Sequence, residues 1–224
     1  MLLLHYRTAW NDYFSTTNPT NLNSQTYTSR QNPSDSSVYV SNCLFNSIVE
    51  SNQGGALYCS SSVAYFLVES SSFFSCKTSS NGGAIYFHNA NSGQCVLHEI
   101  CVNDCCLTST SGSNYQFAYI ELSDGASNKN YVNYSSIVRC VNANSNSWYT
   151  FVIGNGKLYF PSVNISNNKC QYSSVVYCWP FVDSNSFTSS LSYSSFADNN
   201  AFGYICFHLN RGGANYEMKS CNIL

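Results

Sequence analysis

The sequence predicts an all-β protein that folds as a parallel β-helix of about six to seven coils. Three observations lead to this fold class: a repeated glycine-rich phrase, a composition typical of strands and turns, and a second anchor that carries the repeat along the chain. The phrase Gly54-Gly55-Ala56-Leu57-Tyr58-Cys59 returns 28 positions later as Gly82-Gly83-Ala84-Ile85-Tyr86-Phe87. Self-similarity at a fixed period of about 20–50 residues is typical of stacked architectures.

The composition favours strands and turns over helices. Hydrophobic residues make up 44% and aromatic residues 16% of the 224 residues, which is enough for an ordered core. Charged residues are only 9%, against about 25% in typical soluble domains. Tyr, Phe, Val and Thr favour strands, whereas Ser, Asn and Gly favour turns. A single all-β domain of this length is common.

The charge pattern argues against several partners. A net charge of -2 and nine scattered Lys and Arg residues provide no basic patch for nucleic acid or anionic lipid. No apolar stretch approaches the ~20 residues of a membrane-spanning helix. The chain stops at Cys221–Leu224, in the middle of what resembles another repeat. We therefore expect a truncated array, with any membrane attachment in a segment outside these residues.

Residues 1–36 differ in composition from the rest of the chain. An apolar start that includes Trp10, Tyr13 and Phe14 is followed by a polar run with little periodicity. We expect the start to cap the repeat array, because a bare terminal coil exposes apolar side chains and unpaired strand edges. The polar run is expected to be a loop or flexible lead. Residues 37–224 are then the array of β-helix coils.

The second anchor is an apolar residue, two further residues, and then Cys, Asn or an aliphatic residue. Its instances start 28, 29, 35, 28, 31 and 25 residues apart: Phe45–Ile48, Phe73–Cys76, Val102–Cys105, Ile137–Cys140, Ile165–Asn168, Phe196–Asn199 and, as a seventh, Cys221–Leu224. A short strand is expected after each polar turn, at residues 56–58, 84–86, 117–120, 149–152, 175–178 and 204–207. Segments such as 63–68 and 95–100 supply a second strand to the unit.

Units of this size correspond to single coils of a parallel β-helix. Coils stacked about 4.8 Å apart pair each strand with its equivalents above and below. Phe45 is then expected to stack near Phe73, and Cys76, Cys105 and Cys140 to form a column. A propeller blade takes about 40–50 residues, which is longer than this repeat. A β-sandwich gives no reason for a repeated Gly-Gly-Ala phrase.

Alternation of side chains along a strand predicts which residues face the core. Four residues are expected to point inward, namely Leu57, Cys59, Ile85 and Phe87. Four are expected to point outward, namely Ala56, Tyr58, Ala84 and Tyr86. The pairs Gly54-Gly55 and Gly82-Gly83 suit a sharp corner that needs a positive φ or a close backbone approach.

The repeats also resemble those of two groups of known proteins. Gly-Gly-Ala-Leu and Gly-Gly-Ala-Ile, with Phe-x-x-Cys at Phe73–Cys76 and Phe-x-x-Asn at Phe196–Asn199, are similar to repeats of polymorphic outer membrane proteins and of Ser-, Asn- and Cys-rich β-helix surface proteins of trichomonad protozoa. The clear match covers about residues 38–90. It implies a right-handed, single-stranded, pectin-lyase-like β-helix with an adhesive or antigenic role. Here Ile48 departs from the Phe-x-x-Asn pattern, and the Gly-Gly pair is lost after the second repeat.

An enzymatic site needs separate consideration, because many parallel β-helices are polysaccharide lyases or hydrolases. Such chemistry requires two or more carboxylates that converge on one face. No carboxylates lie one period apart on the recurrent strand, and the best cluster is Glu99 with Asp104 near Arg139. We interpret these three as solvated turn charges and expect no catalytic residues and no cofactor.

Twelve cysteines, an even number, suggest an oxidising compartment but do not fix a connectivity. Cys95, His98, Cys101 and Cys105 have the residue types of a zinc site. They lack a Cys-x-x-Cys pair, however, and neighbouring strand residues face opposite sides, so we expect no metal site. Buried free thiols and disulfides between neighbouring coils both remain possible, because stacked Cα atoms at about 4.8 Å lie within the range of a disulfide.

Tyr58 and Tyr86 are the candidate partner-binding residues. In register and pointing outward beside Asn and Ser, their rings are expected to form a flat surface suited to sugars or protein partners. The alternative is that they only cover the flank, because cross-strand aromatic pairs stabilise sheets.

Three functional hypotheses follow. The first is a non-enzymatic cell-surface or secreted β-helix for adhesion, antigenic display or scaffolding, with a host or matrix protein or a glycan as its partner. The second is a carbohydrate-active enzyme or glycan-binding module on the same scaffold. The third is a cytosolic structural repeat protein, which predicts twelve free thiols.

Overall fold

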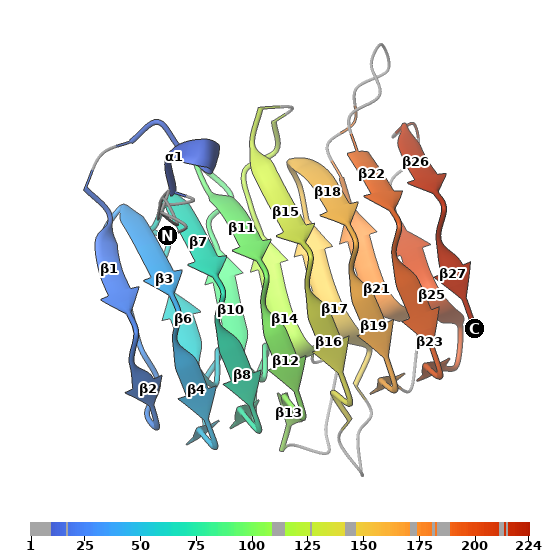
Figure 1. Cartoon of the computed structure of the whole chain (residues 1–224), viewed down its shortest axis with the longest axis horizontal. Helices are drawn as coiled ribbons and strands as arrows, with labels where there is room; N and C mark the ends of the chain where they lie inside the picture. The colour runs from blue at the N-terminus through green and yellow to red at the C-terminus, as the bar shows by residue number, and fades with distance from the viewer. Residues whose placement is uncertain are drawn as a thin grey trace, which may run out of the picture.

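The computed structural model describes residues 10–16, 18–108, 115–125, 127–141, 147–170, 174–180, 182, 189–210, 213 and 215–224. The described chain contains the four-residue helix α1 (Trp10–Tyr13) and otherwise β-strands. The strands wind into a parallel β-solenoid whose two ends carry the first and last strands (Figure 1). The predicted all-β parallel β-helix is therefore confirmed.

Three long parallel sheets form the sides of the solenoid. Sheet A consists of β1 (Thr20–Asn23), β3 (Ser37–Ser41), β7 (Tyr65–Glu69), β11 (Gln94–His98), β15 (Lys129–Asn133), β18 (Lys157–Pro161), β22 (Ser189–Ser192) and β26 (Tyr216–Lys219). Sheet B consists of β2 (Thr26–Tyr27), β4 (Leu44–Asn46), β8 (Ser72–Phe74), β12 (Cys101–Asn103), β16 (Ser136–Val138), β19 (Asn164–Ser166), β23 (Ser195–Ala197) and β27 (Asn222–Ile223).

The third side is sheet C, which consists of β6 (Leu57–Cys59), β10 (Ile85–His88), β14 (Tyr115–Glu121), β17 (Tyr149–Gly154), β21 (Ser174–Trp179) and β25 (Tyr204–Leu209). Two small sheets lie between B and C. They contain β5 (Val49–Glu50), β9 (Lys77–Thr78) and β13 (Cys106–Leu107), and β20 (Lys169–Cys170) with β24 (Asn200–Ala201).

Equivalent residues stack in register, as a solenoid requires. Leu57 pairs with Ile85, and Phe45 pairs with Phe73. The rings of Phe45 and Phe73 are parallel within 4°, with centroids 4.8 Å apart. Both are fully buried. The same inward column of sheet B runs through Val102, Ile137, Ile165 and Phe196.

The expected seventh anchor at Cys221–Leu224 is shifted by two residues. Phe196 pairs with Ile223 and not with Cys221. Cys221 instead lies in the corner between sheets A and B, where its thiol faces the carbonyl oxygens of Leu191 and Lys219. Apolar residues occur both at the second position of this corner and at the second position of the sheet B strand, so the sequence pattern did not separate the two positions.

Every corner between sheets A and B has the same length of two residues, and the first of them is left-handed. The φ angles of this first residue lie between 45° and 55° at all eight described corners, at Ser24, Asn42, Ser70, Glu99, Tyr134, Ser162, Tyr193 and Ser220. The corner that follows sheet B also begins with a left-handed residue, at Ser47, Ser75, Asp104, Arg139, Asn167 and Asp198. A left-handed residue other than glycine costs roughly 1–2 kcal/mol, which the stacked strands on both sides must offset.

The glycine pairs form a different corner, at the entrance to sheet C. Gly54 and Gly82 have φ angles of 70° and 72°, which favour glycine. Gly55 and Gly83 are required for another reason, namely the close approach of the neighbouring coil. A Cβ atom on Gly83 would overlap the carbonyl oxygen of Gln116 and lie 2.7 Å from the backbone N and O of Cys106.

Ala56 and Ala84 were expected to face outward, but both are fully buried. They precede β6 and β10, at the bend where the chain enters sheet C, so the alternation of the strand does not extend to them. Within the strands the alternation holds: Leu57 is buried and Tyr58 is half-buried.

A ladder of thiols and amides follows the corner after sheet B and explains why Cys and Asn exchange in the repeat. The thiols of Cys76 and Cys105 lie 3.5 Å from the carbonyl oxygens of Phe45 and Phe73 in the preceding coil. The amide Nδ2 of Asn168 donates to the carbonyl of Ile137 at 3.0 Å, and that of Asn199 donates to Ile165 at 2.7 Å. Each side chain thus gives a donor to the same inward strand of the coil before it.

The first described residues, 10–16, do not lie over the end of the solenoid. Trp10 and Phe14 pack against Tyr39, Leu67 and Val96, which are outward-facing residues of three successive strands of sheet A. Helix α1 therefore lies along the flank (Figure 1). The stretch expected as a loop or lead contains β1 and β2, which form the first strands of sheets A and B. Residues 1–9 of the expected cap lie outside the described residues.

Candidate functional site

The outer face of sheet C carries a ladder of stacked tyrosines, and this ladder is the candidate functional site. Tyr58 stacks on Tyr86 with ring centroids 5.6 Å apart and 7° between the planes, and Tyr86 stacks on Tyr119 at 5.3 Å and 18°. All three lie in register on adjacent strands. Tyr58 and Tyr86, singled out from the sequence, are therefore the beginning of a longer array.

The ladder continues around Val152. This residue occupies the next outward position, between Tyr119 and Tyr177, and it is fully buried. Tyr115 stacks on Tyr119 at 4.9 Å and on Tyr149 at 5.8 Å, and Tyr149 stacks on Tyr177 at 4.3 Å. Stacked aromatic pairs contribute about 0.5–1.5 kcal/mol each beyond their buried area, so the ladder stabilises the outer face of sheet C.

Both ends of the ladder are closed by other side chains. The guanidinium of Arg30 lies 5.7 Å from the ring centroid of Tyr58. At the other end, Tyr177 contacts Trp179 and His208, each with a centroid separation of 5.1 Å. The faces of the rings are thus taken up within the protein, and the ring edges and hydroxyl groups face outward. The flat aromatic platform expected from the sequence is replaced by a row of ring edges.

A second, polar row lies beside the ladder. His88, Glu121, Gly154 and Trp179 are in register on four adjacent strands. His88 Nε2 lies 3.5 Å from Glu121 Oε2, and the hydroxyl of Tyr119 donates to the same carboxylate. The indole of Trp179 covers Gly154 so closely that a Cβ atom there would overlap the ring. The ladder is therefore flanked by hydrogen-bonding groups.

Three hydroxyl groups of the ladder, those of Tyr86, Tyr115 and Tyr119, are held in their protonated form. Burial raises the pKa of Tyr86 and of Tyr115. Burial also raises the pKa of Tyr119, and its hydrogen bond to the Glu121 carboxylate acts in the same direction. These groups therefore remain neutral hydrogen-bond donors and acceptors at neutral pH.

Tyrosines in the later expected strands are a sequence signal for the full ladder. Tyr119, Tyr149 and Tyr177 all lie in segments expected as strands, but the Gly-Gly-Ala phrase that marked the register is absent from those coils. Tyr115 joins the ladder where the pairing of β14 with β17 shifts its register, between Tyr115 and Ala118. This shift has no pattern of its own in the sequence.

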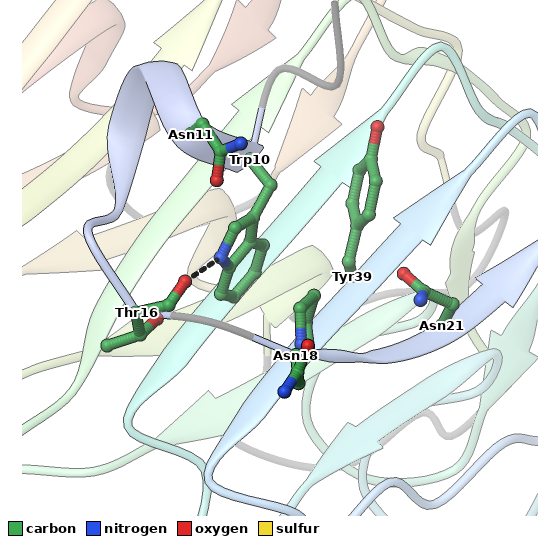
Figure 2. A pocket seen from close by; sticks show the side chains of 7 residues that line it. Trp10, Asn11, Thr16, Asn18, Asn21 and Tyr39 are labelled. Atoms are coloured by element: carbon green, nitrogen blue, oxygen red, sulfur yellow. Dashed lines mark hydrogen bonds between the residues drawn. The ribbon is translucent and has the colours of Figure 1, made fainter.

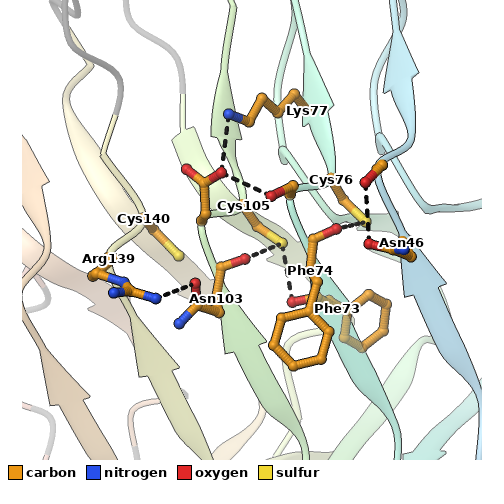
Figure 3. A network of polar contacts seen from close by, with 12 residues as sticks. Asn46, Phe73, Phe74, Cys76, Lys77, Asn103, Cys105, Arg139 and Cys140 are labelled. Atoms are coloured by element: carbon orange, nitrogen blue, oxygen red, sulfur yellow. Dashed lines mark hydrogen bonds and ion pairs between the residues drawn. The ribbon is translucent and has the colours of Figure 1, made fainter.

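Of the three charged residues considered for catalysis, Asp104 and Arg139 line one pocket, whereas Glu99 lies apart from them. Glu99 and Asp104 occupy successive corners at opposite ends of β12, on the order of 15 Å apart along the extended chain, and Glu99 is paired with Ser70. Asp104 binds Lys77 at 3.1 Å and Ser75 at 2.8 Å, whereas Arg139 donates to Asn103 at 3.0 Å (Figure 3). Each charge is thus engaged with its nearest neighbour in the stack.

The four residues considered for zinc are also kept apart. Cys95 and Cys105 point into the core from sheet A and from the corner after sheet B, whereas Cys101 is exposed. His98 lies on the outer face of sheet A, where Nδ1 is 3.1 Å from the hydroxyl of Tyr13. No group of three potential metal ligands occurs among the described residues.

All twelve cysteines are described, and none of them is bridged. Nine are buried, and burial raises the pKa of Cys106 to about 11 and that of Cys170 to about 12. Burial raises the pKa of Cys105 as well. The column of Cys76, Cys105 and Cys140 consists of thiols that serve as core side chains and weak donors (Figure 3).

A shallow pocket of about 340 Å³ lies between α1 and the start of sheet A. Trp10, Thr16, Asn18, Asn21 and Tyr39 are among its lining residues (Figure 2). The indole nitrogen of Trp10 donates to the carbonyl of Thr16 at 2.8 Å and fixes the segment after the helix. The residues that line the pocket are uncharged. We assign them a structural role, which is to hold α1 against sheet A.

Comparison with known proteins gave no match: no family model, curated protein or solved structure is significantly similar to the chain. Among the described residues, no helix has the length and apolar character needed to cross a membrane.

Proposed function

We propose that the protein is a non-enzymatic scaffold, displayed at a cell surface or secreted, that binds a host or matrix protein through the outer face of sheet C. We further propose that its coil is right-handed and of the pectin-lyase-like type. The observation that carries the proposal is the tyrosine ladder with its flanking polar row. The similarity of the repeats to surface β-helix proteins supports the adhesive role.

The geometry of the ladder favours a protein partner over a sugar. A glycan ring stacks on the face of an aromatic side chain, and these faces are occupied by neighbouring rings, by Arg30 and by Trp179. Hydroxyl groups and ring edges repeated at the strand spacing suit the polar and apolar groups of another protein. Tyrosine is also among the residues that contribute most to protein interfaces.

The test is a binding panel of matrix proteins and glycans with the wild type and the double variant Tyr58→Ser/Tyr86→Ser. We expect one or more matrix proteins to bind and the double variant to lose at least about tenfold in affinity, because truncating even one hot-spot residue of an interface costs about 2 kcal/mol or more. Tyr193→Ser is the matched control, because Tyr193 is an exposed corner residue away from sheet C.

Other outcomes of the panel would contradict the proposal. Glycan binding lost in Trp179→Ala with no protein bound would favour a lectin-like module. Cleavage of a polyuronate that is abolished by Glu99→Ala would establish an enzyme.

A second candidate, a structural repeat protein in a reducing compartment, is favoured by the twelve unbridged thiols. If it is correct, protein isolated from its source without reductant releases twelve thiols on unfolding, and bridged cysteines would support the surface location instead. In the native protein we expect one fast-reacting thiol toward a disulfide reagent, Cys101, because it is the exposed cysteine. Cys101→Ser should remove the fast phase and leave the slow reaction unchanged.

A further inference from the structure

The sequence contains two Asn-x-Ser triplets of the kind that accepts an N-linked glycan in secreted proteins. They are Asn133-Tyr134-Ser135 and Asn164-Ile165-Ser166, and both lie among the described residues. In a chain this rich in Asn and Ser such triplets also arise by chance, so the triplet alone does not identify an acceptor. The two differ in the structure, because one is part of a corner of the coil and the other is not.

The hydroxyl group of the first triplet is needed by the fold. Ser135 is the second residue of the corner between β15 and β16, where its Oγ donates to the carbonyl of Asn133 at 2.7 Å and accepts from the backbone amide of Ile100 at 3.2 Å. Ser71 and Ser194 make the equivalent pair of hydrogen bonds at the corners of their own coils. Ser135 is therefore explained by its role in the corner.

Asn133 is also closed to modification in the folded protein. Its side chain is 3% exposed, and Nδ2 donates to the hydroxyl of Tyr13 at 2.9 Å. Tyr13 is the last residue of α1, and its neighbours Trp10 and Phe14 pack on the same face of sheet A. A sugar on Nδ2 would occupy the place of this segment, so a glycan at Asn133 and the docked α1 exclude each other.

Asn164 lies in an open position on the outer face of sheet B. Its side chain points outward from β19 and is exposed. The residues beside it on the neighbouring strands are Ser136 and Ser195, which are small. The hydrogen bonds of Nδ2 to Ser136 Oγ and Ser166 Oγ are long, at 3.3 Å and 3.4 Å, and both hydroxyl groups can rotate away. The amide is therefore accessible, and a sugar attached to it has room.

No requirement of the coil explains the hydroxyl group of Ser166. The equivalent positions of sheet B hold residues as different as Phe74, Asn103, Val138 and Ala197. Ser166 lies on the same side of β19 as Asn164, because alternate residues of a strand share a face. The second triplet thus combines an accessible amide with a hydroxyl that the fold does not need.

We propose that Asn164 carries an N-linked glycan and that Asn133 does not. This inference rests on the proposed secreted or cell-surface location, because the donor, an oligosaccharide joined to a lipid through pyrophosphate, belongs to the secretory pathway. In the reaction, Nδ2 of Asn164 forms a bond to the anomeric carbon of the first sugar. The bond from that carbon to the pyrophosphate oxygen breaks, the lipid pyrophosphate leaves, and Nδ2 gives up one proton. No oxidation or reduction is involved.

A glycan at Asn164 shields sheet B and leaves sheet C free. The described strands of sheet B contain no charged side chain, and Phe74 and Cys101 are exposed on this sheet. A glycan is bulky and strongly hydrated, so it supplies the solubility that this face lacks. The tyrosine ladder belongs to a different side of the solenoid. The modification is therefore compatible with a partner bound to sheet C.

The test maps glycans on the protein isolated from its source and on the full 224-residue chain secreted by a eukaryotic cell line. An amidase that cuts between Asn and the first sugar converts each occupied Asn to Asp, which peptide mass analysis locates. We expect this conversion at Asn164 and an unchanged Asn133 in the folded, secreted fraction. Asn164→Gln and Ser166→Ala should each remove the whole glycan mass. Asn133→Gln and Ser135→Ala, the matched controls, should leave it unchanged.

The two preparations separate a failure of the site from a failure of the location. An unmodified Asn164 in the host-secreted chain, or a glycan at Asn133, overturns the assignment wherever the protein resides. A glycan at Asn164 in the host-secreted chain, together with an unmodified protein from the source, overturns the secreted or cell-surface location and keeps the site as an acceptor. Near-UV circular dichroism checks the fold of each variant, and the wild-type mapping alone decides the assignment if a control variant unfolds.

Discussion

Gly83→Ala is expected to destabilise the protein by about 3 kcal/mol or more and to prevent folding at physiological temperature. The new Cβ atom would overlap the carbonyl oxygen of Gln116 and crowd the backbone of Cys106. These are backbone atoms of the next coil, so relief requires the coils to separate. Overpacking of a well-packed interior typically costs 1–3 kcal/mol, and more when the obstacle cannot move. Urea unfolding followed by tryptophan fluorescence measures the loss.

Gly125→Ala is the matched control for this prediction. A Cβ atom on Gly125 would meet only the side-chain amide of Asn128, with Nδ2 at 3.0 Å, and that flexible group can move away. We expect a change within about 1 kcal/mol. Equal unfolding midpoints for the wild type and Gly83→Ala would show that the coils are not in contact at this glycine.

Phe73→Ala is expected to cost about 3–5 kcal/mol, the usual range for truncating a buried phenylalanine. The ring is fully buried, stacks on Phe45 and continues the column of sheet B toward Val102. Its removal leaves a cavity between two coils whose spacing is fixed by backbone hydrogen bonds, so little collapse can fill the space.

The neighbouring residue provides a stringent control. Phe74 has the same side chain but points outward and is 37% exposed. Phe74→Ala should change the free energy of unfolding by no more than about 1 kcal/mol. If the two substitutions had equal effects, or if Phe74→Ala were the more damaging, the strand register described for β8 would be wrong. The comparison uses chemical unfolding of both variants under the same conditions.

The sequence was sufficient for the architecture because the strongest repeat is also the core. The offset that links Phe45 to Phe73 and Leu57 to Ile85 is the pairing found between neighbouring coils. Alternation within the strands also placed Leu57 and Cys59 on the buried side. These features depend only on local periodicity, which a single sequence reveals.

Features that depend on contacts between distant segments could not be predicted. The left-handed corners are occupied by Ser, Asn, Glu, Asp, Tyr and Arg, so no glycine marks them, and their conformation is imposed by the strands on each side. The docking of Trp10 on Leu67 and Val96 joins residues more than fifty positions apart. The path of the tyrosine ladder through Tyr115 and Tyr149 likewise depends on ring contacts between neighbouring strands.

The constant two-residue corner between sheets A and B has a consequence for how such a gene can change. Differences in spacing, such as the 35 residues between Val102 and Ile137, must fall in the loops that connect the other sides. A unit of one complete coil, with its strands in sheets A, B and C, therefore joins its neighbours through the same corner at any level of the stack. Duplication or deletion of one unit by recombination lengthens or shortens the rod by one step without altering its cross-section, so related alleles can differ in reach while keeping the same faces.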